Sequence, residues 1–188
     1  MLNNLRDSLK PVLQKIGKSF AATGLSPNVF TGVGLALAFI ASILYGVGFE
    51  YSLLLGGIAL LASGFFDIVD GQVARHTNKI SKSGGFLDSV FDKIAEVAIF
   101  FGILVGNYTD PYLVFTAITL SLLVSYTRAK ADAAGIKMQG LGIGERAERL
   151  LVIAIIGMIG FMEIAIIIVI IITAITLCQR ISILIKNR

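Results

Sequence analysis

Four aspartates within one short stretch carry the clearest chemical signal of this sequence. They are Asp67, Asp70, Asp88 and Asp92. The members of the first pair lie three residues apart and those of the second pair four apart, so each pair shares one face of a helix. Two helices joined by the polar turn 76–83 would direct four carboxylates at a single point.

The composition places these acids in a membrane protein. The chain has 188 residues, of which 56% are apolar and 15% are charged, whereas soluble domains average about 25% charged residues. A charged side chain at the centre of a membrane helix costs about 2.5–3.5 kcal/mol, so four clustered carboxylates need counter-charges. Oxygen ligands suit Mg²⁺, Mn²⁺ or Ca²⁺, and two such ions would balance four aspartates. One histidine and one cysteine are too few for a typical zinc site.

The elements that position the aspartates are predicted to be membrane helices. A span needs about 20 apolar residues, and six segments fit this length, the fifth being the shortest. They cover residues 29–49, 52–75, 85–107, 111–134, 147–161 and 163–184. Residues 1–22 place apolar and basic side chains on opposite sides, as expected for an amphipathic helix on a membrane surface. The predicted fold is an all-α integral membrane protein, in which this surface helix (1–22) precedes a six-transmembrane-helix bundle (23–188).

The basic residues indicate the orientation of this bundle. All 16 Lys and Arg residues lie in the N-terminal helix or in 75–93, 128–149 and 180–188. The turns that would lie on the other side of the membrane contain none. This asymmetry predicts that both termini and the aspartate stretch face the cytoplasm, with the protein in the cell membrane.

The aspartate stretch also resembles a known family. It follows the pattern D-x2-D-G-x2-A-R-x8-G-x3-D-x3-D from Asp67 to Asp92, which is the signature of the CDP-alcohol phosphotransferases. The resemblance implies a six-helix membrane fold, usually a homodimer. It also implies transfer of a phosphatidyl-type group from a CDP-linked lipid to an alcohol, with release of CMP.

The resemblance assigns a role to each aspartate. Asp67, Asp70 and Asp88 would bind the metal, Mg²⁺ or Mn²⁺. Asp92 would bind metal and also take the proton from the attacking hydroxyl. The chemistry agrees, because displacing CMP from a diphosphate needs charge neutralisation, which a two-metal site supplies. A positioned carboxylate base also helps a poorly nucleophilic alcohol.

Six further residues are expected, by resemblance, to contact the CDP part of the lipid. They are Asn28, Thr31, Gly71, Ala74, Arg75 and Ser81. Gly71 and Ala74 are small and share a helix face with the aspartates, which lets a ligand approach the backbone closely. For Asn28 and Thr31, capping at the start of the first span is an equally good explanation.

A second polar stretch, residues 125–149, bears on the acceptor alcohol. It contains five basic residues, and anchoring at the membrane surface leaves unexplained why Arg146 and Arg149 lie one helical turn apart. Arginines that converge on a pocket suit a phosphate, so we expect an acceptor that carries one.

The same stretch resembles the branch of the family that makes phosphatidylinositol phosphate, together with its archaeal counterpart that uses CDP-archaeol. In that branch the acceptor is inositol 1-phosphate. The residues that this resemblance assigns to the acceptor phosphate, or places near it, are Ser125, Arg128, Arg146, Arg149 and Arg180. The sequence departs from the branch at Ala147, where proline is typical, and in the exchange of Lys and Arg at 128 and 130.

Other functions stay open at this point. The same chemistry could use glycerol 3-phosphate or serine as the acceptor. A divalent-cation transporter would also contain aspartates within the membrane, but these acids cluster near one face instead of lining a path across the bilayer. No nucleic-acid partner is expected.

Overall fold

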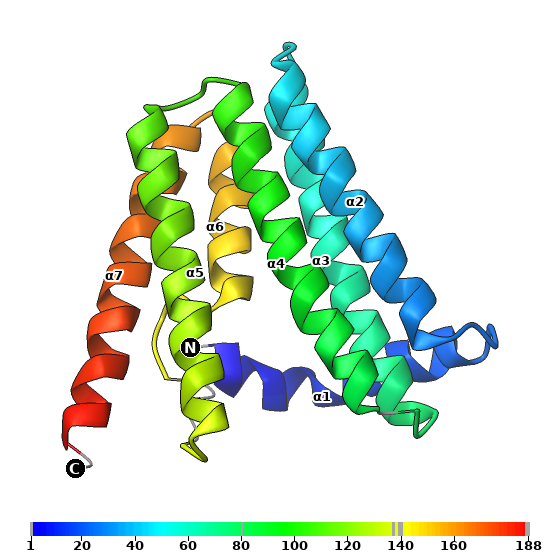
Figure 1. Ribbon diagram of the computed structural model, residues 1–188. Helices are drawn as coiled ribbons and strands as arrows, with labels where there is room; N and C mark the ends of the chain where they lie inside the picture. Colours follow the sequence, from blue (N-terminus) through cyan, green and yellow to red (C-terminus); the bar gives the residue numbers. More distant parts are fainter. Residues whose placement is uncertain (1, 80, 137, 139–140, 187–188) are drawn as a thin grey trace.

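The computed structural model describes residues 2–79, 81–136, 138 and 141–186. Within these residues the chain forms helices and their connections, in the following order: α1 (Leu2–Ala21), α2 (Pro27–Val47), α3 (Ser52–His76), α4 (Lys82–Val105), α5 (Pro111–Ala133), α6 (Arg146–Met158) and α7 (Met162–Lys186). Helices α2 to α7 run up and down the bundle, and α1 lies across one end of it (Figure 1). The all-α prediction is confirmed.

Local signals fix where the helices begin and end. Pro27 and Pro111 stand in the first turns of α2 and α5, where a missing backbone N–H costs nothing. The carboxylate of Asp110 accepts a hydrogen bond from the Tyr112 backbone N–H at 2.8 Å and caps α5. Gly48 ends α2 with a φ of 68°, a left-handed conformation that glycine adopts without strain. The turn between the two aspartate helices is shorter than predicted, because His76 ends α3 and Lys82 already belongs to α4.

In the described part of the chain, four helices are long and apolar enough to cross a membrane, namely α2, α3, α5 and α7. They make the chain a multi-pass membrane protein. The other two predicted spans differ from these. Helix α4 has 24 residues but carries the charges of Asp88, Asp92, Lys93 and Glu96. Helix α6 has 13 residues and is about 20 Å long, less than the hydrocarbon thickness of about 30 Å. Six spans therefore stay a prediction.

Close helix packing holds both aspartate helices against α2. Helix α2 packs against both α3 and α4, and α3 also packs against α6. A Cβ atom at Gly102 of α4 would overlap the backbone of Ser42 in α2, and the Ser42 hydroxyl donates to the carbonyl of Ala98 at 2.5 Å. Small residues permit such approach of backbones in membrane helices. Helix α2 thus holds α3 and α4 in place, and the aspartates of these two helices come within reach of one another.

Candidate active site

Three of the four aspartates bring their carboxylates close together. One oxygen from each of Asp67, Asp88 and Asp92 lies within 4.8 Å of the others. Asp67 comes from α3, and Asp88 and Asp92 come from α4. Asp70 is not in this group, although it lies one turn from Asp67 on the same helix. Four carboxylates were expected to converge, and three of them do. We call these three, Asp67, Asp88 and Asp92, the carboxylate centre.

The donors at this centre fit a divalent cation such as Mg²⁺ or Mn²⁺. All three are carboxylates, the ligand type that these hard cations prefer, and their mutual repulsion favours a bound cation. Asp70 adds a second indication. Its side chain is buried, and its Oδ2 atom has no hydrogen-bond partner among the described residues. Buried polar atoms of this kind are rare and often mark the place of an ion or a water.

A pocket of about 210 Å³ lies next to the carboxylate centre. It is lined by all six residues that were expected to contact the CDP part of a lipid, namely Asn28, Thr31, Gly71, Ala74, Arg75 and Ser81. Asp70 and Asp88 also line it, so Asp88 belongs both to this pocket and to the carboxylate centre. A ligand in the pocket would thus lie directly beside the acids.

The local structure explains why several of these residue types occur at the pocket. The Ser81 hydroxyl accepts a hydrogen bond from the backbone N–H of Gly84 at 3.0 Å and caps α4. A Cβ atom at Gly71 would lie 3.3 Å from Nη2 of Arg75, so the glycine leaves room for the guanidinium. Thr31 donates to the carbonyl of Pro27 at 3.2 Å, a bond within α2 and not a cap, since the N-cap position of this helix is Ser26.

Lys79 also lines this pocket, and the sequence analysis did not single it out. It stands in the turn between α3 and α4 and brings a positive charge to a pocket bordered by Asp70 and Asp88. The signal that could have found it is its position, a basic residue in a turn that is only a few residues long. Such a cation suits a diphosphate.

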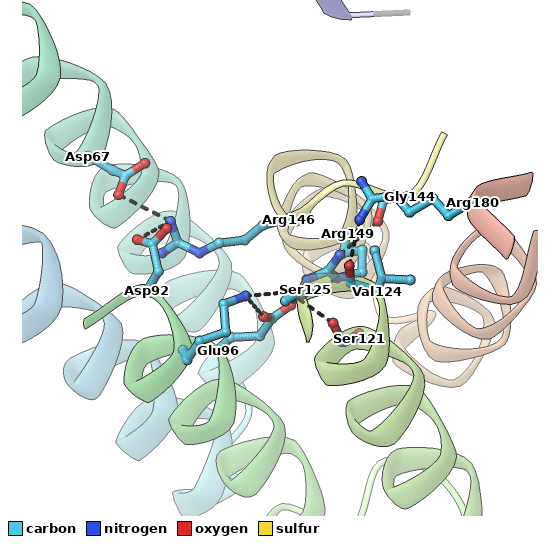
Figure 2. Close-up of polar contacts among 11 residues, drawn as sticks. Asp67, Asp92, Glu96, Ser121, Val124, Ser125, Gly144, Arg146, Arg149 and Arg180 are labelled. Carbon is cyan, nitrogen blue, oxygen red and sulfur yellow. Dashed lines mark hydrogen bonds and ion pairs between the residues drawn. The ribbon is translucent and has the colours of Figure 1, made fainter. Parts of the chain in front are cut away.

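Arg146 reaches from the first turn of α6 into the carboxylate centre. Its Nη1 atom lies 3.1 Å from Oδ1 of Asp67 and 2.5 Å from Oδ1 of Asp92, as Figure 2 shows. Glu145 and Glu148 form a capping box around the start of the helix. The backbone of Arg146 is therefore held in place, and its guanidinium bridges α3 and α4.

Arg149 is buried one turn further along α6. Its Nε and Nη2 atoms both donate to Oε1 of Glu96 in α4, with an Nε distance of 2.9 Å. Its Nη1 atom donates to the carbonyl of Gly144 at 2.7 Å. Lys93 donates to the other Glu96 oxygen at 2.6 Å and to the Ser125 hydroxyl at 2.9 Å, which joins α4, α5 and α6 in one network (Figure 2).

The remaining predicted acceptor residues are more dispersed. Arg180 of α7 is 1% exposed and donates to the carbonyls of Leu141 at 3.1 Å and Val124 at 2.5 Å. Arg128 lies 3.9 Å from the carboxylate of Asp132. Of the five residues expected around an acceptor phosphate, Arg146 alone contacts the carboxylate centre, and Arg149 and Arg180 are enclosed by partners within the protein. Convergence on an open phosphate pocket therefore stays a prediction.

Comparisons with known proteins find a family, named relatives and solved structures that this chain resembles. Residues 25–178 match the CDP-alcohol phosphatidyltransferase family. The archaetidylinositol phosphate synthase of Pyrococcus horikoshii is 39% identical over 158 residues, which are 82% of this chain and 81% of that protein. The fold resembles a crystal structure of Mycobacterium tuberculosis phosphatidylinositol phosphate synthase with CDP-DAG bound, with a TM-score of 0.78, 23% identity and 92% of each chain covered. A structure of the same mycobacterial protein in complex with manganese and citrate also gives a TM-score of 0.78, at 24% identity, with 90% of this chain and 87% of that chain covered.

Proposed function

The chain belongs to the CDP-alcohol phosphatidyltransferase family, and we propose that it transfers the phosphatidyl-type group of a CDP-linked lipid to inositol 1-phosphate and releases CMP. The lipid would be CDP-archaeol or CDP-diacylglycerol. The observation that carries this proposal is the pocket in which all six expected CDP contacts lie beside three clustered carboxylates. The acceptor is inferred from the 39% identical relative, whose name states an archaetidylinositol phosphate product.

The role that we propose for each residue follows from its position. Arg75 and Lys79 would bind the diphosphate in the pocket, where Gly71 and Ala74 let it approach the backbone of α3. Asp67, Asp70, Asp88 and Asp92 would hold one or two Mg²⁺ or Mn²⁺ ions. A bound divalent ion would neutralise charge on the diphosphate oxygens.

Asp92 is the proposed general base of the reaction. It would take the proton from the acceptor hydroxyl, whose oxygen then bonds to the lipid-linked phosphorus, while the bond from that phosphorus to the CMP oxygen breaks. Its position at the carboxylate centre supports this role. In the present structure its carboxylate is paired with Arg146 at 2.5 Å, so this pair must open before the base can act.

The acceptor phosphate is proposed to bind on the α5–α6–α7 side of the carboxylate centre. The residues assigned to this region are Ser125, Arg128, Arg146, Arg149 and Arg180. Arg146 lies nearest to the acids, and Ser125 is joined to the α4 network through Lys93. Arg149 and Arg180 would contact the phosphate only by exchanging an internal partner, such as Glu96 or a backbone carbonyl, for it.

We further propose six spans in the cell membrane, with both termini and the site on the cytoplasmic side and α1 on the membrane surface. The placement of all the basic residues supports this orientation. In addition, α1 crosses the bundle at the end where α3 connects to α4 and α5 to α6 (Figure 1). Labelling of single cysteines from either side of sealed vesicles tests the orientation, and mass measurement in detergent tests the proposed homodimer.

The function is tested by identifying the lipid product. Purified protein in detergent with Mg²⁺ and CDP-archaeol or CDP-diacylglycerol is given inositol 1-phosphate, free inositol, glycerol 3-phosphate or serine. We expect mass spectrometry to detect a new lipid, together with CMP, only with inositol 1-phosphate. A product with glycerol 3-phosphate or serine would show that the proposed acceptor is wrong, while the proposed transferase activity would stand. No product with any of the four would contradict the proposed function and reopen cation transport.

A further inference from the structure

We propose that Arg146 is an internal counter-ion, which occupies the carboxylate centre until a divalent metal ion displaces it. This inference rests on the metal site of the proposed function, but not on the identity of the acceptor. It assigns to Arg146 a role before substrate binds, in addition to any contact with the acceptor. The arginine and the metal would then be alternative ligands of the same acids.

The first argument is the position of the guanidinium. A single nitrogen, Nη1, contacts Asp67 of α3 at 3.1 Å and Asp92 of α4 at 2.5 Å. These are two of the three acids whose oxygens lie close enough to share a cation. Arg146 is far from both in sequence and comes from a different helix, so the contact is a product of the fold. Figure 2 shows its side chain extending from α6 to the acids.

The second argument is space. Asp67, Asp92 and Arg146 border a cavity of about 10 Å³. A cavity needs about 10–15 Å³ to hold one water molecule, so this space holds one water at most. A divalent ion with its remaining water ligands needs more room than this. With the guanidinium in place, this cavity therefore has no room for a hydrated ion.

The third argument is charge. With no metal bound, Arg146 offsets part of the repulsion among Asp67, Asp88 and Asp92. If two divalent ions were bound, they would balance the four aspartates, and the guanidinium would be a surplus positive charge beside them. Withdrawal of the side chain would break no hydrogen bond at its Nε atom, which is buried with no partner among the described residues.

The fourth argument is that the exchange needs only a side-chain movement. The backbone around Arg146 is tied down on both sides of the residue. The N–H of Gly144 donates to the Thr176 hydroxyl at 2.9 Å, and the N–H of Glu145 donates to the Glu148 carboxylate at 2.8 Å. Rotation about the side-chain bonds of Arg146 can withdraw the guanidinium while α6 stays in place.

The test is Mn²⁺ binding to the purified full chain in detergent, without substrates, measured from the electron paramagnetic resonance signal of free Mn²⁺. Arg146→Gln removes the competing charge, and we expect Mn²⁺ to bind about tenfold more tightly, as loss of one ion-pair competitor worth 1.4 kcal/mol would give. Arg146→Lys keeps a compact charge near the acids, and its affinity should lie between the two. Lys130→Gln, which removes an exposed charge that lies over the Tyr126 ring in the last turn of α5, should bind as the wild type does.

Thermal unfolding gives a second readout that a merely structural role would not produce. Without metal, Arg146→Gln should unfold at a lower temperature than the wild type, because the acids lose their cation. In saturating Mn²⁺ the deficit should shrink or vanish. Unchanged Mn²⁺ affinity in Arg146→Gln, or a deficit that is equal with and without Mn²⁺, would overturn the inference while leaving the metal site intact. If neither the wild type nor Arg146→Gln binds Mn²⁺, the metal site itself is wrong and the inference fails with it.

Discussion

Arg149 donates to one carboxylate oxygen of Glu96 through both Nε and Nη2, and both side chains are buried. The two residues are 53 positions apart in the chain, so the ion pair fastens α6 to α4. Glu96 lies one turn beyond Asp92 on the same helix. The pair therefore fixes the relative position of two elements that meet at the carboxylate centre, Asp92 on α4 and Arg146 on α6.

Glu96→Gln is expected to lower the free energy of unfolding by about 3–5 kcal/mol, because it leaves the Arg149 charge buried without its counter-charge. The double variant Glu96→Gln with Arg149→Met should cost less than the sum of the single changes, since no unpaired charge remains at position 149. Unfolding in mixed detergent titrations measures both values. Glu163→Gln, an exposed change on α7, is the control, and strictly additive effects of the pair would contradict a coupled buried contact.

Gly71→Ala should weaken binding of the CDP-linked lipid. The new methyl group would lie 3.3 Å from the Arg75 guanidinium and shift it within the pocket. We expect KM for the lipid to rise about fivefold, which corresponds to about 1 kcal/mol. Gly64→Ala is the matched control, because it lies on the same helix with no other atom near its Cβ position and gains the same helix propensity. Equal KM values in the two variants would show that space beside Arg75 is not needed.

Substitutions at Ser81 separate helix capping from contact with the nucleotide. Ser81→Asn keeps a side chain that can accept the hydrogen bond of the Gly84 N–H, so stability should be preserved. Ser81→Asp caps equally well but adds a negative charge to a pocket proposed to hold a diphosphate. We expect Asp, and not Asn, to raise KM for the lipid, whereas Ser81→Ala should lower the free energy of unfolding by about 1 kcal/mol. An aspartate variant that binds the lipid as well as the asparagine variant does would argue against a diphosphate near Ser81.

Much of this architecture could be predicted from the sequence because it depends on local signals. Apolar length predicted the helices within a few residues, and the Asp67–Asp92 spacing predicted a shared carboxylate centre, which three of the four aspartates form. The residues that line the pocket were expected from the family resemblance, and most of them lie on α3, α4 and the turn between them. Helix length also explains why the fifth predicted span was the least certain, since α6 ends after 13 residues.

The arginine contacts could not be predicted, because they depend on how α6 and α7 pack against distant helices. Nothing in the spacing of Arg146 and Arg149 tells that one reaches Asp67 and Asp92 while the other pairs with Glu96. Both look like anion-binding arginines. Tertiary packing determines whether the partner of each arginine is a ligand or an acidic side chain of the protein. Arg180 shows the same effect, as it donates to carbonyls of residues far from it in the chain.

The central claim is that the carboxylate centre between α3 and α4 is where the CDP-linked lipid is cleaved. The most direct measurement is the rate of CMP release by Asp92→Asn in the presence of Mg²⁺ and inositol 1-phosphate. Asp110→Asn is the matched control, because it is the same substitution at the opposite end of the bundle and retains a capping side chain. We expect Asp92→Asn to be slower than the wild type by at least about a hundredfold, and Asp110→Asn to match the wild type. An Asp92→Asn protein that releases CMP as fast as Asp110→Asn does would contradict the account.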